Sequence, residues 1–205
     1  MLIRSATFKK SAASIRDCPK PSLPEFAFIG RSNVGKSSLI NYLCNNNKLA
    51  KTSATPGKTQ LINHFVINEN WYLVDLPGYG FAKTGKEKKA RFETMIYDYC
   101  KKRETLQCLF VLIDSRLPLQ KIDMEFMLWC AENETPFAII YTKTDKNSKS
   151  ELERNIKAIE KDLLRNWEEL PNAFVTSASA GKGKEDLLEF IDYQIKSQRQ
   201  SPAEE

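Results

Sequence analysis

Eight residues match the phosphate-loop pattern G-x-x-x-x-G-K-[ST]. They are Gly30, Arg31, Ser32, Asn33, Val34, Gly35, Lys36 and Ser37. The glycines allow the backbone to turn its N–H groups inward around phosphate oxygens. The Lys36 ammonium can bind the β- and γ-phosphates in a catalytic role, and the Ser37 hydroxyl can ligate Mg²⁺. Because the segment follows an apolar run and precedes a helical pattern, it predicts a nucleoside-triphosphate site.

A second group of candidates ends the apolar run at residues 71–74. These residues are Asp75, Leu76, Pro77 and Gly78, which form a D-x-x-G pattern. A carboxylate at this strand end can hold Mg²⁺ through water, and the Gly78 N–H can sense a γ-phosphate during catalysis. The pattern is common alone, but here it follows the phosphate loop, a helix and a long loop in order.

The long polar loop over residues 44–60 is the candidate for a nucleotide-dependent switch. Thr59 is preferred to Thr55 as a second Mg²⁺ ligand, because Gly57 can bring the following backbone close to the phosphates. The nucleotide-contacting residues expected here are Gly57, Lys58, Thr59, Gln60 and Leu61.

Two further segments are candidates for reading the base. One is Thr142, Lys143, Thr144 and Asp145, and the other is Thr176, Ser177 and Ala178. The Asp145 carboxylate can accept hydrogen bonds from guanine N1–H and N2–H₂, which adenine does not offer in that arrangement. The stem of Lys143 can lie against the base plane. A backbone N–H of the Ser177–Ala178 turn could donate to guanine O6, so the two segments together predict guanine specificity.

These residues require a sheet that brings several strand ends together. Six apolar runs predict strands near residues 26–29, 65–67, 71–74, 109–113, 137–141 and 174–176. Helical patterns cover residues 36–46, 87–103, 120–132, 150–167 and 184–197. The alternation predicts an α/β P-loop NTPase fold: a doubly wound, mostly parallel six-stranded sheet with helices on both faces. We expect one GTP-binding domain over residues 1–197 and a disordered tail over residues 198–205.

Composition narrows the class of protein further. The 205 residues carry 31 Lys and Arg against 26 Asp and Glu, and the net charge of +5 permits a polyanionic partner without requiring one. The five cysteines form no C-x-x-C pair, and the single histidine, His64, excludes a multi-histidine metal site. No apolar run approaches the roughly 20 residues of a membrane span. We expect a monomer in the reducing cytoplasm, with His64 in a structural role and no membrane partner.

The motifs together resemble those of the EngB (YihA-like) family of bacterial translation-factor-related GTPases. The matching stretches are residues 30–41, 55–63, 74–83, 142–145 and 176–178. Thr142, where many GTPases have Asn, agrees with this family. The resemblance implies GTP hydrolysis, Mg²⁺ ligation by Ser37 and Thr59, assembly of the large ribosomal subunit, and a role in cell division and septation. It also implies a strand near residues 3–11.

Three features bear on the mechanism. Tyr79 follows D-x-x-G where many GTPases have the water-orienting Gln, which predicts slow intrinsic turnover and stimulation by a partner. Asn33 is a candidate K⁺ ligand, although its type also suits turn geometry. Residues 83–91 hold five basic residues against one acidic, which is either an rRNA-facing patch or a solvated helix start.

Two other functions remain open from the sequence. A P-loop kinase would share the phosphate loop, but the T-K-x-D segment and the lack of an Arg-rich lid disfavour it. A division-site interaction module would make hydrolysis incidental. Comparison of ATP with GTP binding tests the first alternative, and association of GTP-loaded and GDP-loaded protein with large-subunit precursors tests the second.

Overall fold

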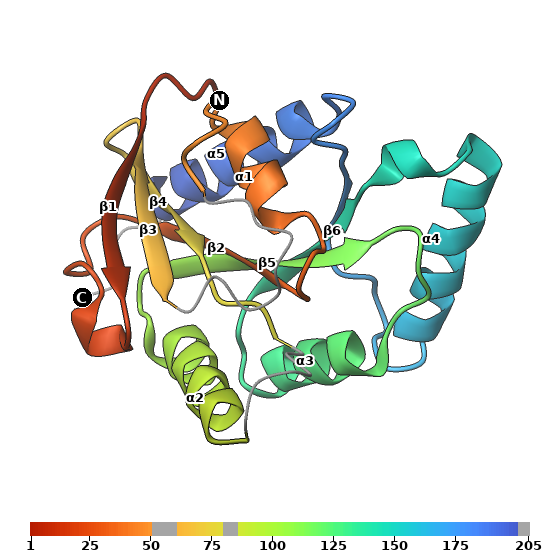
Figure 1. Cartoon of the computed structure of the whole chain (residues 1–205), viewed down its shortest axis with the longest axis horizontal. Coiled ribbons are helices and arrows are strands. Elements are labelled where there is room, and N and C mark those ends of the chain that lie inside the picture. The colour runs from red at the N-terminus through yellow and green to blue at the C-terminus, as the bar shows by residue number, and fades with distance from the viewer. Residues whose placement is uncertain (51–60, 80–85, 201–205) are drawn as a thin grey trace.

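A seven-stranded sheet forms the centre of the computed structural model, which describes residues 1–50, 61–79 and 86–200 (Figure 1). The strands are β1 (Ala6–Ala12), β2 (Glu25–Gly30), β3 (Ile62–Ile67), β4 (Trp71–Asp75), β5 (Leu106–Asp114), β6 (Phe137–Thr142) and β7 (Ala173–Val175). Their spatial order is β1-β3-β4-β2-β5-β6-β7. The β1–β3 and β3–β4 pairs are antiparallel, whereas β4, β2, β5, β6 and β7 run parallel. The parallel strands therefore bring their carboxyl ends to one edge of the sheet.

The sheet has one strand more than the six that the apolar runs predict, so that number is corrected to seven. The additional strand is β1, which pairs with β3 at the sheet edge and places Phe8, Lys9 and Lys10 in solvent. An edge strand that is largely open to water needs no continuous apolar run, and edge lysines discourage pairing with other chains. A strand near residues 3–11 was implied by the family resemblance, and β1 overlaps most of that range.

Five α-helices and two short 3₁₀ helices complete the described part of the chain. They are η1 (Ile15–Asp17), α1 (Lys36–Leu43), α2 (Lys86–Lys102), α3 (Lys121–Glu132), η2 (Thr144–Lys146), α4 (Lys149–Leu163) and α5 (Lys184–Gln200). Helices α1 and α5 cover one face of the sheet, and α2, α3 and α4 cover the other (Figure 1). The doubly wound α/β prediction is confirmed.

Helix α5 continues three residues into the range predicted as a disordered tail. Residues 198–200 are Gln-Arg-Gln, which are good helix formers, and the next helix-breaking residue is Pro202. The predicted tail therefore begins too early, and residues 201–205 lie outside the described part of the chain.

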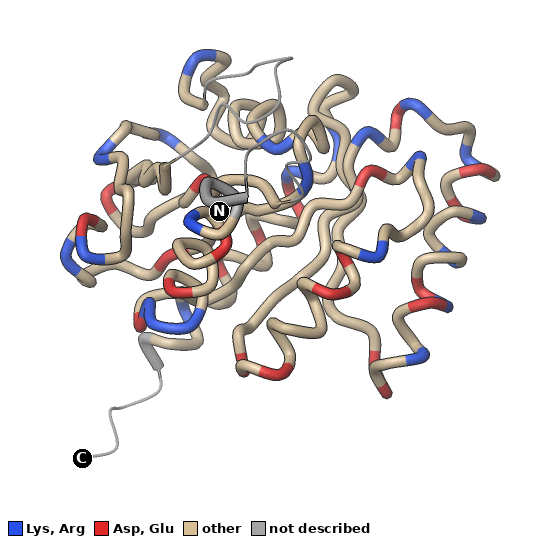
Figure 2. The backbone as a smooth tube through the Cα atoms, turned by 60° about the horizontal axis from the view of Figure 1, so that its bottom comes forward, with Lys and Arg blue, Asp and Glu red and all other residues tan. Residues whose placement is uncertain are grey.

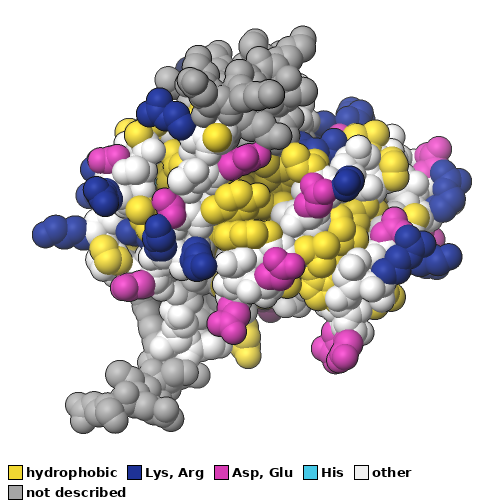
Figure 3. All heavy atoms as spheres, turned by 90° about the horizontal axis from the view of Figure 1, so that it is seen from below, with side chains coloured by type: hydrophobic (Ala, Val, Ile, Leu, Met, Phe, Trp, Pro, Cys, Tyr) yellow, Lys and Arg dark blue, Asp and Glu magenta, His cyan; other side chains and the backbone are white. Residues whose placement is uncertain are grey.

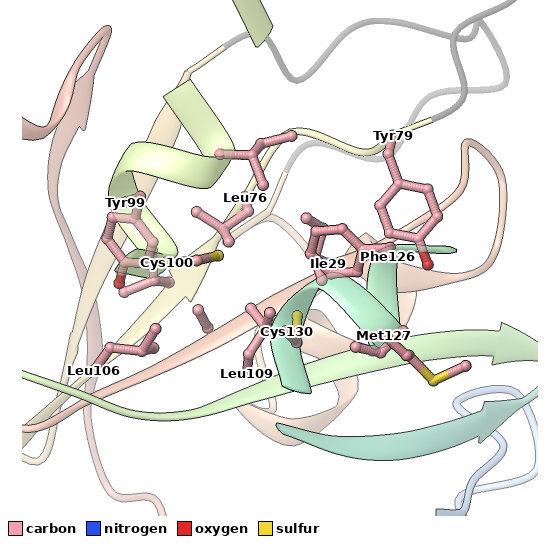
Figure 4. Packing of buried hydrophobic residues seen from close by; sticks show 14 of the residues in the cluster. Ile29, Leu76, Tyr79, Tyr99, Cys100, Leu106, Leu109, Phe126, Met127 and Cys130 are labelled. Atoms are coloured by element: carbon pink, nitrogen blue, oxygen red, sulfur yellow. The ribbon is translucent and has the colours of Figure 1, made fainter. Parts of the chain in front are cut away.

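The core consists of two apolar clusters separated by the sheet. Alternate residues of β2 enter opposite clusters: Phe26 and Phe28 pack with α1 and α5, while Ala27 and Ile29 pack with α2 and α3. Figure 4 shows the second cluster, in which Ile29 lies beside Phe126 and Met127 of α3. Burial on both faces explains why β2, β5 and β6 read as continuous apolar runs in the sequence. Each fully buried large side chain contributes about 2 kcal/mol to the stability of this sheet.

The remaining expectations about side-chain chemistry concern the cysteines and His64. All five cysteines are free and buried. His64 lies on β3, fully buried, with its Nε2 3.3 Å from the Glu25 carboxylate. Within the part of the chain that the structure describes, we find no helix long and apolar enough to cross a membrane.

Candidate nucleotide site

The phosphate loop joins β2 to α1 at the carboxyl edge of the sheet. Gly35 caps α1 with φ 106°, and Asn33 has φ 62°. Glycine adopts this left-handed region without steric cost, and asparagine tolerates it better than most residues. Gly30 is required for a different reason, since a Cβ there would lie 2.9 Å from the Leu112 carbonyl oxygen of β5. The loop is thus shaped by backbone conformation at Gly35 and by close packing at Gly30.

Lys36 and Asp75 form a buried ion pair beneath this loop. Lys36 is the first residue of α1, and Asp75 is the last residue of β4, which pairs with β2. The predicted adjacency of the D-x-x-G carboxylate and the phosphate-loop lysine is therefore present. The Ser32 hydroxyl is buried in the same loop without a hydrogen-bond partner among the described residues. An unpaired buried hydroxyl is costly, and a phosphate oxygen bound in the loop would give it a partner.

Gly78 lies against the backbone of the phosphate loop. A Cβ at this position would lie 2.6 Å from the Gly30 carbonyl oxygen, and the next residue, Tyr79, forms an isolated bridge with Arg31. A side chain at residue 78 would thus displace one of these segments. Between Asp75 and Gly78, Leu76 is buried in the core and its N–H donates to the Phe28 carbonyl oxygen at 3.0 Å.

The T-K-x-D segment is bonded directly to the phosphate loop. The Thr142 hydroxyl donates to the Val34 carbonyl oxygen at 2.6 Å. The Lys143 ammonium donates to the Asn33 carbonyl oxygen at 2.6 Å and to Asp114 at 2.9 Å. Lys143 itself has φ 58°, which turns the chain sharply after β6. The sequence predicts base stacking for the stem of Lys143, but the bonds from its ammonium to the phosphate loop and Asp114 are visible only in the structure.

Asp145 and the turn after β7 meet at the far side of the site. The Ser177 hydroxyl donates to Asp145 at 2.6 Å, and this bond lowers the pKa of Asp145 to about 2. The Thr144 hydroxyl donates to the Thr176 carbonyl oxygen at 3.0 Å. The two segments predicted to read the base are therefore adjacent, and Ala178 follows Ser177 in the same turn.

Asp114 is a component of the site that the sequence analysis did not identify. It ends β5, between the two strands that carry the phosphate loop and the T-K-x-D segment. Burial raises its pKa, but hydrogen bonds from Arg116 and Lys143 outweigh this effect and lower the pKa to about 2. Its signal in the sequence was available, because a carboxylate directly follows the apolar run 109–113.

Part of the predicted site lies outside the described residues. These are Gly57, Lys58, Thr59 and Gln60, together with residues 83–85 of the basic stretch. The side chains of residues 86–89 also lie outside. Leu61 is described and is 39% exposed just before β3. Tyr79 is described too, and its hydroxyl donates to Asp123 of α3 at 2.9 Å.

The donor set of the site suits Mg²⁺ bound together with phosphate. Among the residues that the structure describes, no three His, Cys, Asp or Glu side chains cluster as a metal site. The available groups are the Ser37 hydroxyl in the first turn of α1 and the Asp75 carboxylate, both oxygen donors. Such a set leaves the remaining positions to phosphate oxygens and water, as Mg²⁺ prefers.

A phosphate loop between a strand and a helix, an Asp and a Gly after β4, and T-K-x-D after β6 define a P-loop NTPase of the GTPase type. Comparisons with known proteins support this class. Residues 25–143 match the family model described as "50S ribosome-binding GTPase".

The "Probable GTP-binding protein EngB" of Flavobacterium psychrophilum is 57% identical over 193 residues, covering 94% of each chain. The protein of the same name from Christiangramia forsetii is 54% identical over 192 residues, covering 94% of this chain and 97% of the relative. A crystal structure titled as a probable GTP-binding protein engB superposes with a TM-score of 0.63 at 24% identity, covering 84% of this chain and 99% of that one. The chain belongs to the EngB family of GTPases.

Proposed function

We propose that the chain binds GTP with Mg²⁺ at this strand-end site and hydrolyses it to GDP and phosphate as a slow molecular switch. The observation that carries the proposal is the direct bonding of the T-K-x-D segment to the phosphate loop through Thr142 and Lys143. This bonding fixes the distance between the groups suited to the phosphates and the carboxylate suited to the base. A single guanine nucleotide would bridge them.

The phosphate end of the site would work through four groups. Lys36 exchanges its ion pair with Asp75 for the β- and γ-phosphate oxygens, because the phosphates carry more negative charge. Ser37 and Thr59 would ligate Mg²⁺, and Asp75 would hold it through water. Bound Mg²⁺ supplies positive charge that offsets the charge on the phosphates. Gly78 donates its N–H to the γ-phosphate.

The base end would select guanine through Asp145. The Asp145 carboxylate is ionised at neutral pH, as an ordinary aspartate is, and hydrogen bonds, first of all from Ser177, lower its pKa further to about 2. It would therefore accept from two guanine donors. The stem of Lys143 would lie under the base while its ammonium stays on Asn33 and Asp114. The turn at Ser177 and Ala178 supplies an N–H to guanine O6.

Nucleotide competition tests this assignment and the kinase alternative together. We expect GTP and GDP to displace a fluorescent guanine nucleotide, and ATP at a hundredfold excess to have no effect. The expected product is inorganic phosphate released to water in a Mg²⁺-dependent reaction. Binding of ATP as tight as that of GTP, or transfer of phosphate to a small molecule, would contradict the proposal.

Asn33 keeps both of its interpretations in this proposal. Its left-handed φ of 62° is the conformation for which a turn selects asparagine. If Asn33 also binds K⁺, GTP hydrolysis should be faster in K⁺ than in Na⁺ at equal ionic strength. Equal rates in the two salts would leave only the turn role.

We further propose that the partner of the GTP-bound form is a precursor of the large ribosomal subunit, bound through its rRNA. The match to a family described as 50S ribosome-binding supports this partner. A second, independent support is the surface around β1, η1 and the end of α2. These elements form one surface, because η1 lies against both β1 and α2. Exposed cations gather there without an ion-pair partner among the described residues; they are Lys9, Lys10, Arg16, Lys20 and Lys101.

Figures 2 and 3 show Lys and Arg at the side of the molecule formed by β1 and η1, with acidic residues between them. Phe8, which precedes Lys9 on β1, is 58% exposed, and its ring packs on Phe65 on the face of the sheet that α1 and α5 cover. Lysine and arginine side chains suit phosphates, so the surface fits an RNA backbone better than it fits a neutral partner.

Co-sedimentation with large-subunit precursors tests the partner. We expect the protein loaded with a non-hydrolysable GTP analogue to sediment with the particles, and the GDP-loaded protein to stay free. The septation role would then follow from defective ribosome supply. Normal particle profiles in depleted cells that nevertheless fail to divide would favour the division-site alternative.

A further inference from the structure

A buried carboxylate on α3 contacts both segments that flank the γ-phosphate position. Asp123 lies in the first turn of α3 and its side chain is fully buried. One of its oxygens accepts a hydrogen bond from the Tyr79 hydroxyl at 2.9 Å. The other lies 3.1 Å from Nε of Arg31. We call these three residues, Arg31, Tyr79 and Asp123, the α3 latch.

The two partners of Asp123 are each one residue from a group that the phosphates would touch. Arg31 follows Gly30 in the phosphate loop, and Tyr79 follows Gly78. Gly78 in turn lies so close to Gly30 that only a glycine fits. The latch therefore holds two backbone segments, which lie far apart in the sequence, against each other at the point where a γ-phosphate would sit.

Burial of the Asp123 carboxylate costs free energy, which its contacts must offset. Desolvation raises the pKa of Asp123, while the Tyr79 bond and the Arg31 charge oppose that rise. The Tyr79 ring packs on Phe126 with centroids 4.8 Å apart, so the hydroxyl has little freedom to leave the carboxylate (Figure 4). An apolar residue at position 123 would suit such surroundings better, which indicates that the carboxylate is retained for what it holds.

We propose that Asp123 is a positioning residue of the nucleotide site, which sets discrimination between GTP and GDP by holding Gly78 against the phosphate loop before the nucleotide arrives. This inference rests on the proposed function. GTP binding then needs little further ordering of the Gly78 N–H, so the latch strengthens binding of the nucleotide that has a γ-phosphate. GDP lacks that group and gains nothing from the latch.

The latch also assigns a role to Arg31. Its side chain is turned toward α3 and paired with Asp123, so it helps to position the phosphate loop. It is therefore not available as an arginine finger. This assignment agrees with slow intrinsic hydrolysis that depends on a partner.

The test compares Tyr79→Phe and Asp123→Asn with the wild-type chain. Tyr79→Phe keeps the ring packed on Phe126 and removes only the hydroxyl, so it remains informative if Asp123→Asn fails to fold. We expect each variant to weaken binding of a non-hydrolysable GTP analogue about tenfold. GDP affinity should change by no more than about twofold, and KM for GTP should rise more than kcat falls.

The matched control is Asp192→Asn, which neutralises a partly exposed carboxylate on α5 that pairs with Lys196 and lies away from the nucleotide site. It should leave both affinities at the wild-type values. The double variant Tyr79→Phe/Asp123→Asn should lose less than the sum of the two single losses, because both changes act on the same three-residue contact.

An equal loss of affinity for the GTP analogue and GDP, or no loss for either, would overturn the latch. If the wild-type chain binds neither nucleotide, the proposed function fails and the latch fails with it. If the wild-type chain binds GTP and GDP, and the latch variants bind both as tightly as the Asp192→Asn control does, the latch alone fails.

Discussion

The hydroxyl of Thr142 forms a hydrogen bond that joins the T-K-x-D segment directly to the phosphate loop. Many GTPases have asparagine at this position, and the substitution leaves the Asp145 carboxylate in place. Thr142 donates to Val34 at 2.6 Å from a fully paired strand end, and Lys143 adds a second bond one residue further. The short Thr142 side chain is thus long enough to bond to the phosphate loop, because β6 already ends within hydrogen-bond distance of that loop.

Removal of this hydroxyl should loosen the phosphate loop. Thr142→Val keeps the shape of the side chain but leaves the Val34 carbonyl without its donor. We expect a loss of about 1–3 kcal/mol in the free energy of unfolding and weaker binding of both GTP and GDP. Thr94→Val, which removes an exposed hydroxyl on α2, should change neither quantity. Urea unfolding and nucleotide titration measure the two effects, and a Thr142 variant as stable as the Thr94 variant would refute the link.

Substitution of Asp145 should alter base specificity more than stability. Asp145→Asn replaces one acceptor by a donor that faces the guanine N–H groups. We expect a loss of GTP affinity of about a hundredfold, with phosphate-dependent binding of ATP unchanged. The comparison is Asp162→Asn, an exposed carboxylate on α4 that pairs with Arg165. GTP binding that survives Asp145→Asn would show that the base is read elsewhere.

The elements on the α2 side of the sheet are joined by one buried carboxylate at the start of β2. Glu25 is fully buried and accepts hydrogen bonds from Tyr99 of α2 and from Arg103, which follows that helix. His64 of β3 lies against the same carboxylate. The Arg103 guanidinium also reaches the Pro19 carbonyl oxygen in the chain that leads into β2. Three elements that are distant in sequence are thereby fixed around one charge.

This cluster predicts a specific acid sensitivity. Burial raises the pKa of Glu25, but hydrogen bonds from His64, Arg103 and Tyr99 outweigh it and lower the pKa from 4.5 to about 2. A lowered pKa in the folded state gives stability that is present above pH 4.5 and is lost as the pH falls toward 2. The difference corresponds to about 3 kcal/mol.

Glu25→Gln should remove this part of the pH dependence. It should also cost about 3–5 kcal/mol at neutral pH, because Arg103 is left buried without its counter-charge. The measurement is the free energy of unfolding at several pH values between about 2 and 7 for both proteins. Parallel pH profiles for the two proteins would contradict the assignment.

Over the whole molecule, the modest net charge of +5 is unevenly distributed. Five cations without an ion-pair partner among the described residues lie around β1, η1 and the carboxyl end of α2, and β1 is the sheet edge opposite β7. The predicted patch at residues 83–91 runs into the first turns of α2, so most of its basic residues lie on the same helix as Lys101, at its opposite end. Its side chains before residue 90 lie outside the described part, and its role in RNA binding remains a prediction.

Charge reversal on β1 should weaken binding to large-subunit precursors. We expect Lys9→Glu/Lys10→Glu to lower the affinity of the GTP-loaded protein and to make binding less dependent on salt. The slope of log affinity against log salt should become shallower by about one unit for each RNA phosphate that is no longer neutralised. Lys157→Glu/Lys161→Glu on the exposed face of α4 makes the same change in net charge and should have little effect. Equal losses in the two variants would mean that net charge, and not this surface, governs association.

The sequence determines the chemistry of this protein and the order of its elements. The phosphate loop, D-x-x-G, T-K-x-D and the turn at residues 176–178 are local patterns, and each needs only its own residues to be recognised. The alternation of apolar runs with helical patterns likewise predicts the doubly wound sheet, since strands buried on both faces must be apolar throughout. The exception is β1, whose place at the edge removes that requirement.

The tertiary structure decides which of these residues contact each other. The bonds from Thr142 and Lys143 to the phosphate loop join positions 108 and 110 residues apart. The partners of Glu25 and Asp123 are similarly distant. Such pairs depend on the order of strands in the sheet and on which face each helix covers, and no local pattern encodes either. The physical reason is that burial selects the partners of these charges only after the whole sheet has formed.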